Sequence, residues 1–249
     1  YNILSMKVRS SLQESSNELS AEDGIRTSLR LGDSSLIIGE VRSNEAKALY
    51  EAMRVGALAN VVAGTVHGNS PYSVFDRIVN DLQVPITSFK ATDLILVANP
   101  VKTPDGLHSK RRVVQLSEVR KNWTKDPLDE KGFVDLLSYN VEKDSLEPSD
   151  ELINGNSEVI KDIASGVKGW AGNWDAVYDN ILLRGMIKQE IVDMSKKLNK
   201  PELLEAKFNV LANTIFYEVS DQVNIEIGIP LSSKVFPEWK KRILKEIKD

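Results

Sequence analysis

The stretch from residue 29 to residue 67 constrains the fold of this chain more than any other segment. It holds two apolar runs, at 36–38 and 61–66, joined by a segment with the residue spacing of a helix. The first run leads into Glu40 and the second ends at His67. Two buried strands joined by a helical crossover are typical of a parallel sheet in an α/β protein. Ligands bind such sheets beyond the carboxyl ends of the strands, so we expect a functional site where the two runs end.

The first half of the chain alternates helical and strand patterns. Capping residues, apolar periodicity and turn chemistry predict helices at 21–31, 44–55 and 71–82, a buried strand at 93–98, and a hairpin over 101–119. This order predicts an α/β fold with a mainly parallel sheet and an antiparallel edge hairpin, which we assign to a domain of residues 1–123.

The pattern changes after Trp123, where a polar, proline-containing link follows. We expect a short hairpin over 133–146 and then helices at 175–198, 201–219 and 237–248. The second domain, residues 124–249, is therefore predicted to be mostly helical, and its role is left open.

Composition excludes several classes of site. The chain has no cysteine, so it forms no disulfide and no Cys-ligated zinc or iron–sulfur centre. It has two histidines, His67 and His108, which disfavours a multi-His metal site. A net charge of −4 argues against general nucleic-acid binding. No apolar run reaches the roughly 18–20 residues of a membrane helix, so we expect a cytoplasmic protein.

The sequence Gly39-Glu40-Val41-Arg42 places a carboxylate beside an arginine at the end of the first apolar run. In P-loop enzymes, a carboxylate at this position holds magnesium-bound water or orients the attacking water. A surface ion pair between Glu40 and Arg42 is the alternative that this segment alone leaves open. For His67, the alternative is a hydrogen-bonded structural histidine.

The wider sequence resembles one superfamily in three segments that match in order: LRLGDSSLIIGEVR, EAxxLYEAMRVG and VVAGTVHGNSPYSVFDRI. They resemble the ATPases of type II and type IV secretion, type IV pili and archaeal flagella. Among these, the archaeal members are the most similar in sequence. The Walker B box of that superfamily is matched from Leu29 to Arg42. Its histidine box is matched by Gly64-Thr65-Val66-His67.

The resemblance implies a RecA-like P-loop ATPase core that uses ATP and Mg²⁺. By this likeness, Glu40 is the Walker B carboxylate and holds Mg²⁺ through water, and His67 contacts the γ-phosphate region. Arg42 belongs to the same catalytic box, while Arg30 and Arg9 are candidates for binding phosphate, Arg9 from a neighbouring subunit. The partners implied are further copies of the chain in a hexameric ring and a membrane platform protein at the inner face of the cell membrane.

One departure from the superfamily is decisive. A P-loop requires GxxxxGK[ST], and the chain contains no Gly-Lys pair. The superfamily places this loop upstream of the Walker B strand, so we expect a carboxyl-terminal fragment that is inactive by itself. A non-catalytic ring-assembly or partner-binding module is the first alternative. A RecA-like nucleic-acid translocase is the second, and the acidic balance disfavours it.

Three further features receive structural interpretations. We interpret the aromatic segment 169–174 as packing at a helix start, with ligand stacking as the alternative. We expect His108 to be exposed in a hairpin turn. We interpret Arg111-Arg112 and the basic helix at 239–248 as solvated charged faces, with acidic lipid or a partner protein as the alternative.

Overall fold

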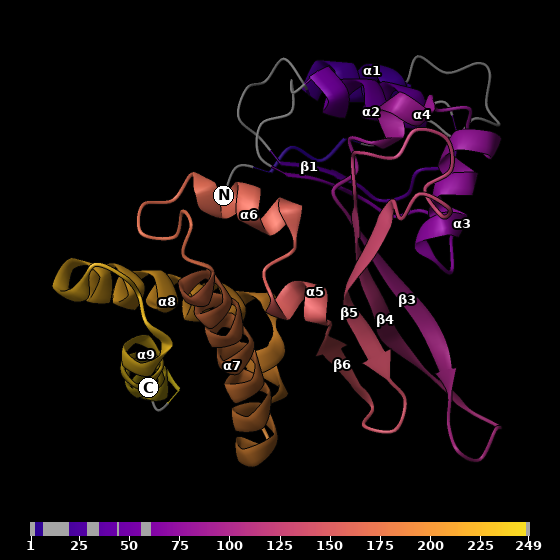
Figure 1. Cartoon of the computed structure of the whole chain (residues 1–249). Coiled ribbons are helices and arrows are strands. Elements are labelled where there is room, and N and C mark those ends of the chain that lie inside the picture. Colours follow the sequence, from indigo (N-terminus) through magenta and orange to yellow (C-terminus); the bar gives the residue numbers. More distant parts are fainter. Residues whose placement is uncertain (1–2, 7–19, 29–34, 44, 56–60, 248–249) are drawn as a thin grey trace. The chain divides into compact units, whose positions relative to one another are not determined.

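The computed structural model of the chain describes residues 3–6, 20–28, 35–43, 45–55 and 61–247 (Figure 1). The chain divides into two compact units, Tyr1–Leu152 and Ile153–Asp249, each with its own apolar core. The first unit contains both sheets, and the second is helical.

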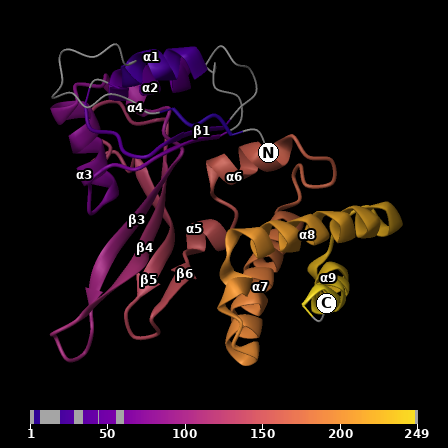
Figure 2. The same ribbon diagram turned by 180° about the vertical axis from the view of Figure 1, so that it is seen from behind.

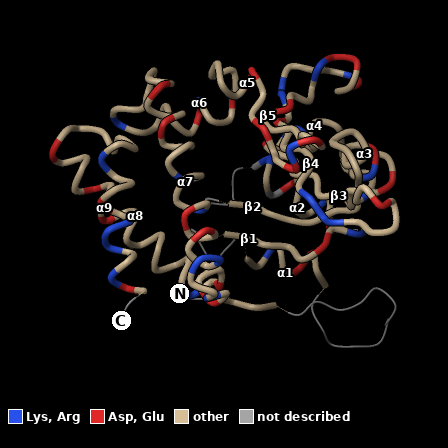
Figure 3. Tube along the Cα trace, turned by 90° about the horizontal axis from the view of Figure 1, so that it is seen from below, with Lys and Arg blue, Asp and Glu red and all other residues tan. Residues whose placement is uncertain are grey.

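A parallel pair of short strands begins the first unit. Strands β1 (Ser35–Ile38) and β2 (Val61–Gly64) run side by side (Figure 3), and Ile38 pairs with Gly64 at their carboxyl ends. Helix α2 (Glu45–Val55) lies between the two strands in the chain, as a crossover connection between parallel strands requires. Helix α1 (Ala21–Ser28) precedes them. The strands predicted at 36–38 and 61–66 and the helix predicted at 44–55 are thus present within the described residues, with β2 ending at Gly64. The expectation that both strands are buried is wrong, because Ile37 and Val61 are 76% and 55% exposed.

A capped helix follows β2 directly. Helix α3 (Pro71–Asp76) starts with a capping box, in which Ser70 accepts a hydrogen bond from the Ser73 backbone N–H. Proline at the first helical position suits this start, because its missing N–H would have no partner in the helix. The helix continues as the π-helical turn η1 (Arg77–Asp81), and α4 (Ile86–Phe89) follows. The helix predicted at 71–82 is therefore confirmed, with its last turn in π-helical geometry.

The larger sheet has four antiparallel strands in sequence order (Figures 1 and 2). These are β3 (Leu94–Lys102), β4 (Ser109–Val119), β5 (Phe133–Asn140) and β6 (Ser145–Pro148). The turn between β3 and β4 is closed by a hydrogen bond from the Thr103 N–H to the His108 carbonyl oxygen at 3.0 Å. Gly106 takes a positive φ of 69° in this turn, which glycine adopts without steric cost. Both predicted hairpins are confirmed.

The predicted balance of the sheets is wrong for the described residues. Two strands pair in parallel and four pair antiparallel, so the described strands do not form a mainly parallel sheet. Strand β3 pairs with β4, and it buries Ile95 and Val97 while Leu94 and Leu96 are 43% and 60% exposed. An apolar run therefore does not indicate a parallel strand covered on both faces here. The coarse description, a mixed α/β protein with a helical second part, holds.

The division of the chain also falls later than the sequence predicts. We expected a boundary between residues 123 and 124, whereas the first unit extends to Leu152. The reason is pairing: β5 pairs with β4 and β6 with β5, so this hairpin belongs to the sheet of the first unit. Backbone hydrogen bonds to β4 are tertiary contacts that the composition of the hairpin does not reveal.

An aromatic cluster fills the core of the first unit. Trp123, Phe75 and Phe89 are each at most 5% exposed, and the rings of Phe75 and Trp123 meet edge to face with centroids 5.7 Å apart. Tyr50 from α2 stacks on Phe89 at 6.1 Å. The same core includes Ile95 and other residues of β3 and β4. The helices that follow β1 and β2 are thereby packed on the larger sheet.

The second unit consists of helices around one core. After α5 (Asp150–Ile153), which spans the division, come α6 (Glu158–Ser165), α7 (Trp174–Leu198), the short 3₁₀ turn η2 (Pro201–Leu204), α8 (Ala206–Ile227) and α9 (Ser232–Glu246). Helix α8 continues eight residues beyond its predicted end at residue 219, to Ile227.

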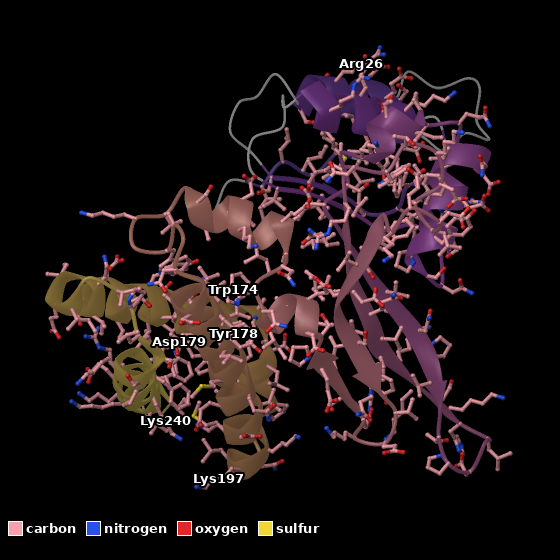
Figure 4. The ribbon with its side chains drawn as sticks, viewed as in Figure 1. Arg26, Trp174, Tyr178, Asp179, Lys197 and Lys240 are labelled. Carbon is pink, nitrogen blue, oxygen red and sulfur yellow. The ribbon has the colours of Figure 1, made fainter. Side chains whose placement is uncertain are left out.

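Helix α9 begins earlier than predicted, at Ser232 and not at Pro237, which lies inside it. Proline removes one helical hydrogen bond there. The burial of Val235 and Trp239, each 0% exposed, favours a helix that continues on both sides of the proline. The Trp239 indole N–H donates to the Ala212 carbonyl oxygen on α8 at 3.0 Å, and Lys240 pairs with Glu190 of α7 at 2.7 Å (Figure 4 labels Lys240).

A carboxylate clamp in the loop before β5 leads to a pH-dependent prediction. Glu130 accepts backbone hydrogen bonds from Lys125 at 2.6 Å, Thr124 at 2.9 Å and Asp126 at 3.0 Å, which lower the pKa of Glu130 to about 2. A lowered pKa stabilises the fold fully above the ordinary value of 4.5, and this stabilisation is lost as the pH falls toward 2. Thermal unfolding should therefore show Glu130→Gln less stable than the parent near neutral pH, with a smaller difference near pH 3.

Asp129→Asn is the matched control, because it removes the neighbouring exposed carboxylate from the same loop. An equal loss of stability for Glu130→Gln at both pH values would show that the ionised carboxylate does not clamp the loop.

Candidate functional site

The carboxyl ends of β1 and β2 are held together beyond their last paired residues. The Val41 N–H donates to the Thr65 carbonyl oxygen at 2.8 Å, and the Thr65 hydroxyl donates to the Gly39 carbonyl oxygen at 2.5 Å. These bonds extend the contact between the two segments past the pair of Ile38 and Gly64. The polar residues that follow the two strands are therefore brought to the same edge, as their positions predict.

Glu40 is the centre of this edge. Its Oε1 atom lies 3.0 Å from His67 Nε2, and its Oε2 atom accepts a hydrogen bond from Arg42 Nη2. The three residues come from two sequence motifs and meet because β1 and β2 are neighbours. The structure thus brings together Glu40, Arg42 and His67, as the sequence predicts. Arg30 and Arg9 lie outside the described residues.

The electrostatics of the cluster keep the carboxylate ionised. The hydrogen bond from Arg42 is the largest effect and lowers the pKa of Glu40. Burial is the next largest effect and opposes it, but the charge of Arg42 and the neighbouring His67 lower the pKa further, so the net shift is downward. The Glu40 side chain is 25% exposed, whereas those of Arg42 and His67 are 69% and 84% exposed. The Glu40 carboxylate is thus partly buried, whereas the Arg42 and His67 side chains that contact it are accessible to a ligand.

Glu45 at the start of α2 positions the arginine backbone. Its carboxylate accepts hydrogen bonds from the backbone N–H groups of Arg42 at 2.7 Å and Ser43 at 2.9 Å. It also accepts one from the Ser43 hydroxyl at 2.5 Å. Burial raises the pKa of Glu45, but the hydrogen bonds from Ser43 and the backbone outweigh it and leave the pKa below its ordinary value. An acidic residue in the first turn also interacts favourably with the helix dipole.

A shallow concavity lies beside His67 and exposes a cation that the sequence analysis missed. It is lined by His67, Gly68, Asn69, Ser73 and Arg77. Gly68 is required there, since a Cβ would come within 2.7 Å of a Val74 methyl group.

Arg77, on η1, lies one helix downstream of the histidine motif and is the missed candidate. Its Nη1 pairs with Asp81 at 3.0 Å, while its buried Nε has no hydrogen-bond partner in the described part of the chain. In the sequence, Arg77 stands out only as an arginine ten positions after His67. Its proximity to His67 depends on where α3 starts, which the motif does not reveal.

The oxygen chemistry of the cluster suits magnesium only in part. Mg²⁺ in nucleotide sites is bound through one or two carboxylates, waters and substrate phosphates. Glu40 supplies one carboxylate, and its oxygens retain lone pairs beyond the bonds to Arg42 and His67. No group of three or more acidic or histidine side chains within the described ranges is arranged to hold a metal ion. Glu40 alone could therefore contact a magnesium ion only through water, and a bound phosphate would have to supply further ligands.

The second histidine is separate from the cluster. His108 is 76% exposed in the β3–β4 turn, where its Nδ1 lies 2.8 Å from Asp105 Oδ2. Hydrogen bonds from Thr103 and His108 hold the pKa of Asp105 well below its usual range. The prediction that His108 is exposed in a hairpin turn is confirmed, and its contacts are those of a turn-stabilising residue.

Comparison with known proteins adds one distant relative. No family model matches the chain. The chain is similar to an uncharacterized protein of Methanocaldococcus jannaschii, at 29% identity over 148 residues. The similar region covers 59% of this chain and 50% of that protein, so the chain spans about half the length of the curated relative it matches. Within the described residues, no helix is long and apolar enough to cross a membrane.

Proposed function

We propose that this chain is the hydrolysis half of a magnesium-dependent ATPase that drives a type II or type IV secretion, pilus or archaeal flagellum system. The observation that carries the proposal is the contact of Glu40 with both Arg42 and His67 at the ends of β1 and β2. The Walker B and histidine motifs of the superfamily supply these residues. Their meeting at one sheet edge supports the resemblance, because a chance match of two motifs does not require them to be neighbours.

Each residue of the cluster has a role in this proposal. Glu40 is ionised and its oxygens accept hydrogen bonds, so it can orient the water that attacks the γ-phosphate. Arg42 and His67 are exposed donors that can stabilise charge on the transferred phosphoryl group. When bound with ATP, Mg²⁺ would neutralise phosphate charge and contact Glu40 through water. The active form in this proposal is a RecA-like hexameric ring at the cytoplasmic face of the membrane, facing a platform protein.

The absence of a P-loop from this chain provides a test of the proposed function. Without a Gly-Lys pair, the 249-residue chain should release phosphate from Mg-ATP no faster than buffer alone. The proposal predicts a longer protein in which GxxxxGK[ST] precedes these residues, and that protein should hydrolyse ATP at an enzymatic rate. Phosphate release by both proteins would be measured in parallel, with and without magnesium.

Two results would contradict the proposal. One is enzymatic hydrolysis by the 249-residue chain itself, which would require a phosphate site that the motifs do not describe. The other is an upstream sequence without a P-loop, which would favour the non-catalytic assembly module. Salt-sensitive binding of DNA to the longer protein would favour the nucleic-acid translocase instead.

A further inference from the structure

A partly open cavity of about 180 Å³ is lined by residues of the second unit alone. Its walls come from four segments: the loop before α7, the first half of α7, the second half of α8, and the link between α8 and α9. The side chains that matter here are those of Trp170, Asn180, Arg184, Phe216, Ser220 and Asp221. Its volume equals that of about six water molecules, so it suits a small ligand or a single functional group.

An arginine lies against an aromatic wall of this cavity. The Arg184 guanidinium lies over the Phe216 ring at 4.7 Å and near the Tyr217 ring at 5.6 Å. Its Nε donates to Asn180 Oδ1 at 3.0 Å, and Asn180 is 5% exposed. Among the contacts of the described residues, the two Nη groups have no hydrogen-bond partner. A guanidinium fixed in this way presents a planar pair of donors, the geometry that binds a carboxylate.

A buried hydroxyl supplies a second, independent observation. Ser220 lines the same cavity and is 7% exposed. Its Oγ is buried and has no hydrogen-bond partner among the described residues. Buried polar groups are almost always paired, because leaving one unpaired costs stability. An unpaired hydroxyl on a cavity wall is therefore an unfilled hydrogen-bonding position for a ligand.

The loop before α7 comes close to the end of α8. Gly169 and Gly228 both have positive φ, 86° and 83°, and a Cβ on Gly169 would lie 3.6 Å from the Gly228 carbonyl oxygen. Asp179 accepts hydrogen bonds from the Ser232 backbone and hydroxyl, which ties α7 to the start of α9. Figure 4 labels Asp179 next to Tyr178 and Trp174 on the first turns of α7. The cavity is thus bounded by backbone that is held in place on both sides.

The two tryptophans of the aromatic segment have different roles. Trp174 stacks on Tyr178 at 6.2 Å and donates to the Ile153 carbonyl oxygen at 2.9 Å, so the packing interpretation is confirmed for it. Trp170 lines the cavity instead. Together with Phe216, it gives the cavity apolar walls for a flat ligand body.

The charge of the lining favours a ligand with one negative charge. Lys168 and Arg184 contribute two positive charges, and Asp221, next to Ser220 in the chain, contributes a negative one. A dianion such as a phosphate monoester would meet repulsion from Asp221, whereas a monoanionic carboxylate meets less.

From these observations, we propose that the cavity binds a small carboxylate with a flat apolar body. The carboxylate pairs with the Arg184 guanidinium and accepts a hydrogen bond from the Ser220 hydroxyl, and the flat body lies against Trp170. This site goes beyond the proposed ATPase function and does not depend on it, because every residue involved belongs to the second unit.

The test uses benzoate as the probe and the uncharged benzamide as its isostere, with binding to the complete 249-residue chain followed by isothermal titration and by amide NMR shifts. Benzoate should bind with a millimolar Kd or better and shift the signals of Ser220 and Lys168, and benzamide should bind at least about tenfold more weakly. Arg184→Lys keeps the charge but loses the planar fork, and Ser220→Ala removes the buried hydroxyl. Each variant should weaken benzoate binding about tenfold or more.

Ser220→Ala also separates a ligand site from a structural role. The variant should unfold at the same temperature as the parent or a higher one, because it removes an unpaired buried hydroxyl. Arg242→Lys on α9 is the control, and its benzoate affinity should equal that of the parent. The proposal fails if benzoate does not bind at millimolar concentration, if benzamide binds equally well, or if both variants retain full affinity. Tighter binding of phenyl phosphate than of benzoate would also overturn the choice of a carboxylate.

Discussion

If the proposed function is right, replacing Glu40 with Gln in the ATPase that contains this chain is expected to slow ATP hydrolysis by about 10²–10⁴-fold, the usual effect of removing a general base. The amide keeps the size of the side chain but carries no charge and does not accept a proton from water. It also loses the ion pair with Arg42 and the contact with His67 in its charged form. ATP affinity should change little, because the phosphate cradle lies elsewhere in the proposal. Steady-state phosphate release and nucleotide binding would be measured on the same preparations.

Glu51→Gln is the matched control for this variant. Glu51 is an exposed carboxylate on α2, eleven residues from Glu40, and it has no role in the proposed site. Its variant should hydrolyse ATP at the parental rate. Undiminished turnover of Glu40→Gln would remove Glu40 from the catalytic machinery and leave the Glu40–Arg42 contact as a surface ion pair.

The largest expected effect on stability follows from truncating Trp123 to Ala. Trp123 is 2% exposed, packs edge to face on Phe75, and lies 6.5 Å from the Phe89 ring. The Lys90 ammonium lies over its ring at 4.7 Å, and its indole N–H donates to the Arg120 carbonyl oxygen at 2.6 Å. Removing a buried aromatic side chain of this kind costs about 3–5 kcal/mol of unfolding free energy.

Urea unfolding followed by far-UV circular dichroism would measure this loss. Trp123→Phe is the informative control, because it keeps an aromatic ring in the cluster and should lose clearly less stability than the alanine variant. A loss below about 1 kcal/mol for Trp123→Ala would mean that the cluster does not support the first unit. Because the chain has two units, the transition of the first unit must be separated from that of the second before a free energy is assigned.

Local chemistry explains which parts of the fold were predictable. The Ser70–Pro71 start of α3 and the turn at Gly106 depend on capping and on backbone freedom within a few residues. The meeting of Glu40 with His67 was predictable for a related reason. Parallel strands joined by a crossover place their carboxyl ends at one edge, so two strand ends identify one site.

The sequence predictions are wrong where the structure of a segment depends on the elements that it packs against. Strand β3 has an apolar run that fits a buried parallel strand, yet it pairs antiparallel with β4 and leaves Leu96 exposed. The sequence predicts that the β5–β6 hairpin belongs to the second domain. It belongs to the first unit, because it pairs with β4, which lies before the polar link. The sequence predicts a helix start at Pro237, whereas the burial of Val235 and Trp239 favours a helix on both sides of it.

The sequence by itself determined the chemistry of the first site: a carboxylate, an arginine and a histidine at the ends of two apolar runs. Only the tertiary structure decided that Arg77 lies beside His67, and that Arg184 and Ser220 line one cavity. Arg184 and Ser220 lie on different helices and belong to no common motif, so no spacing in the chain predicts their meeting. Their proximity depends on how α7 packs against α8, and that packing is set by shape and burial over the whole second unit.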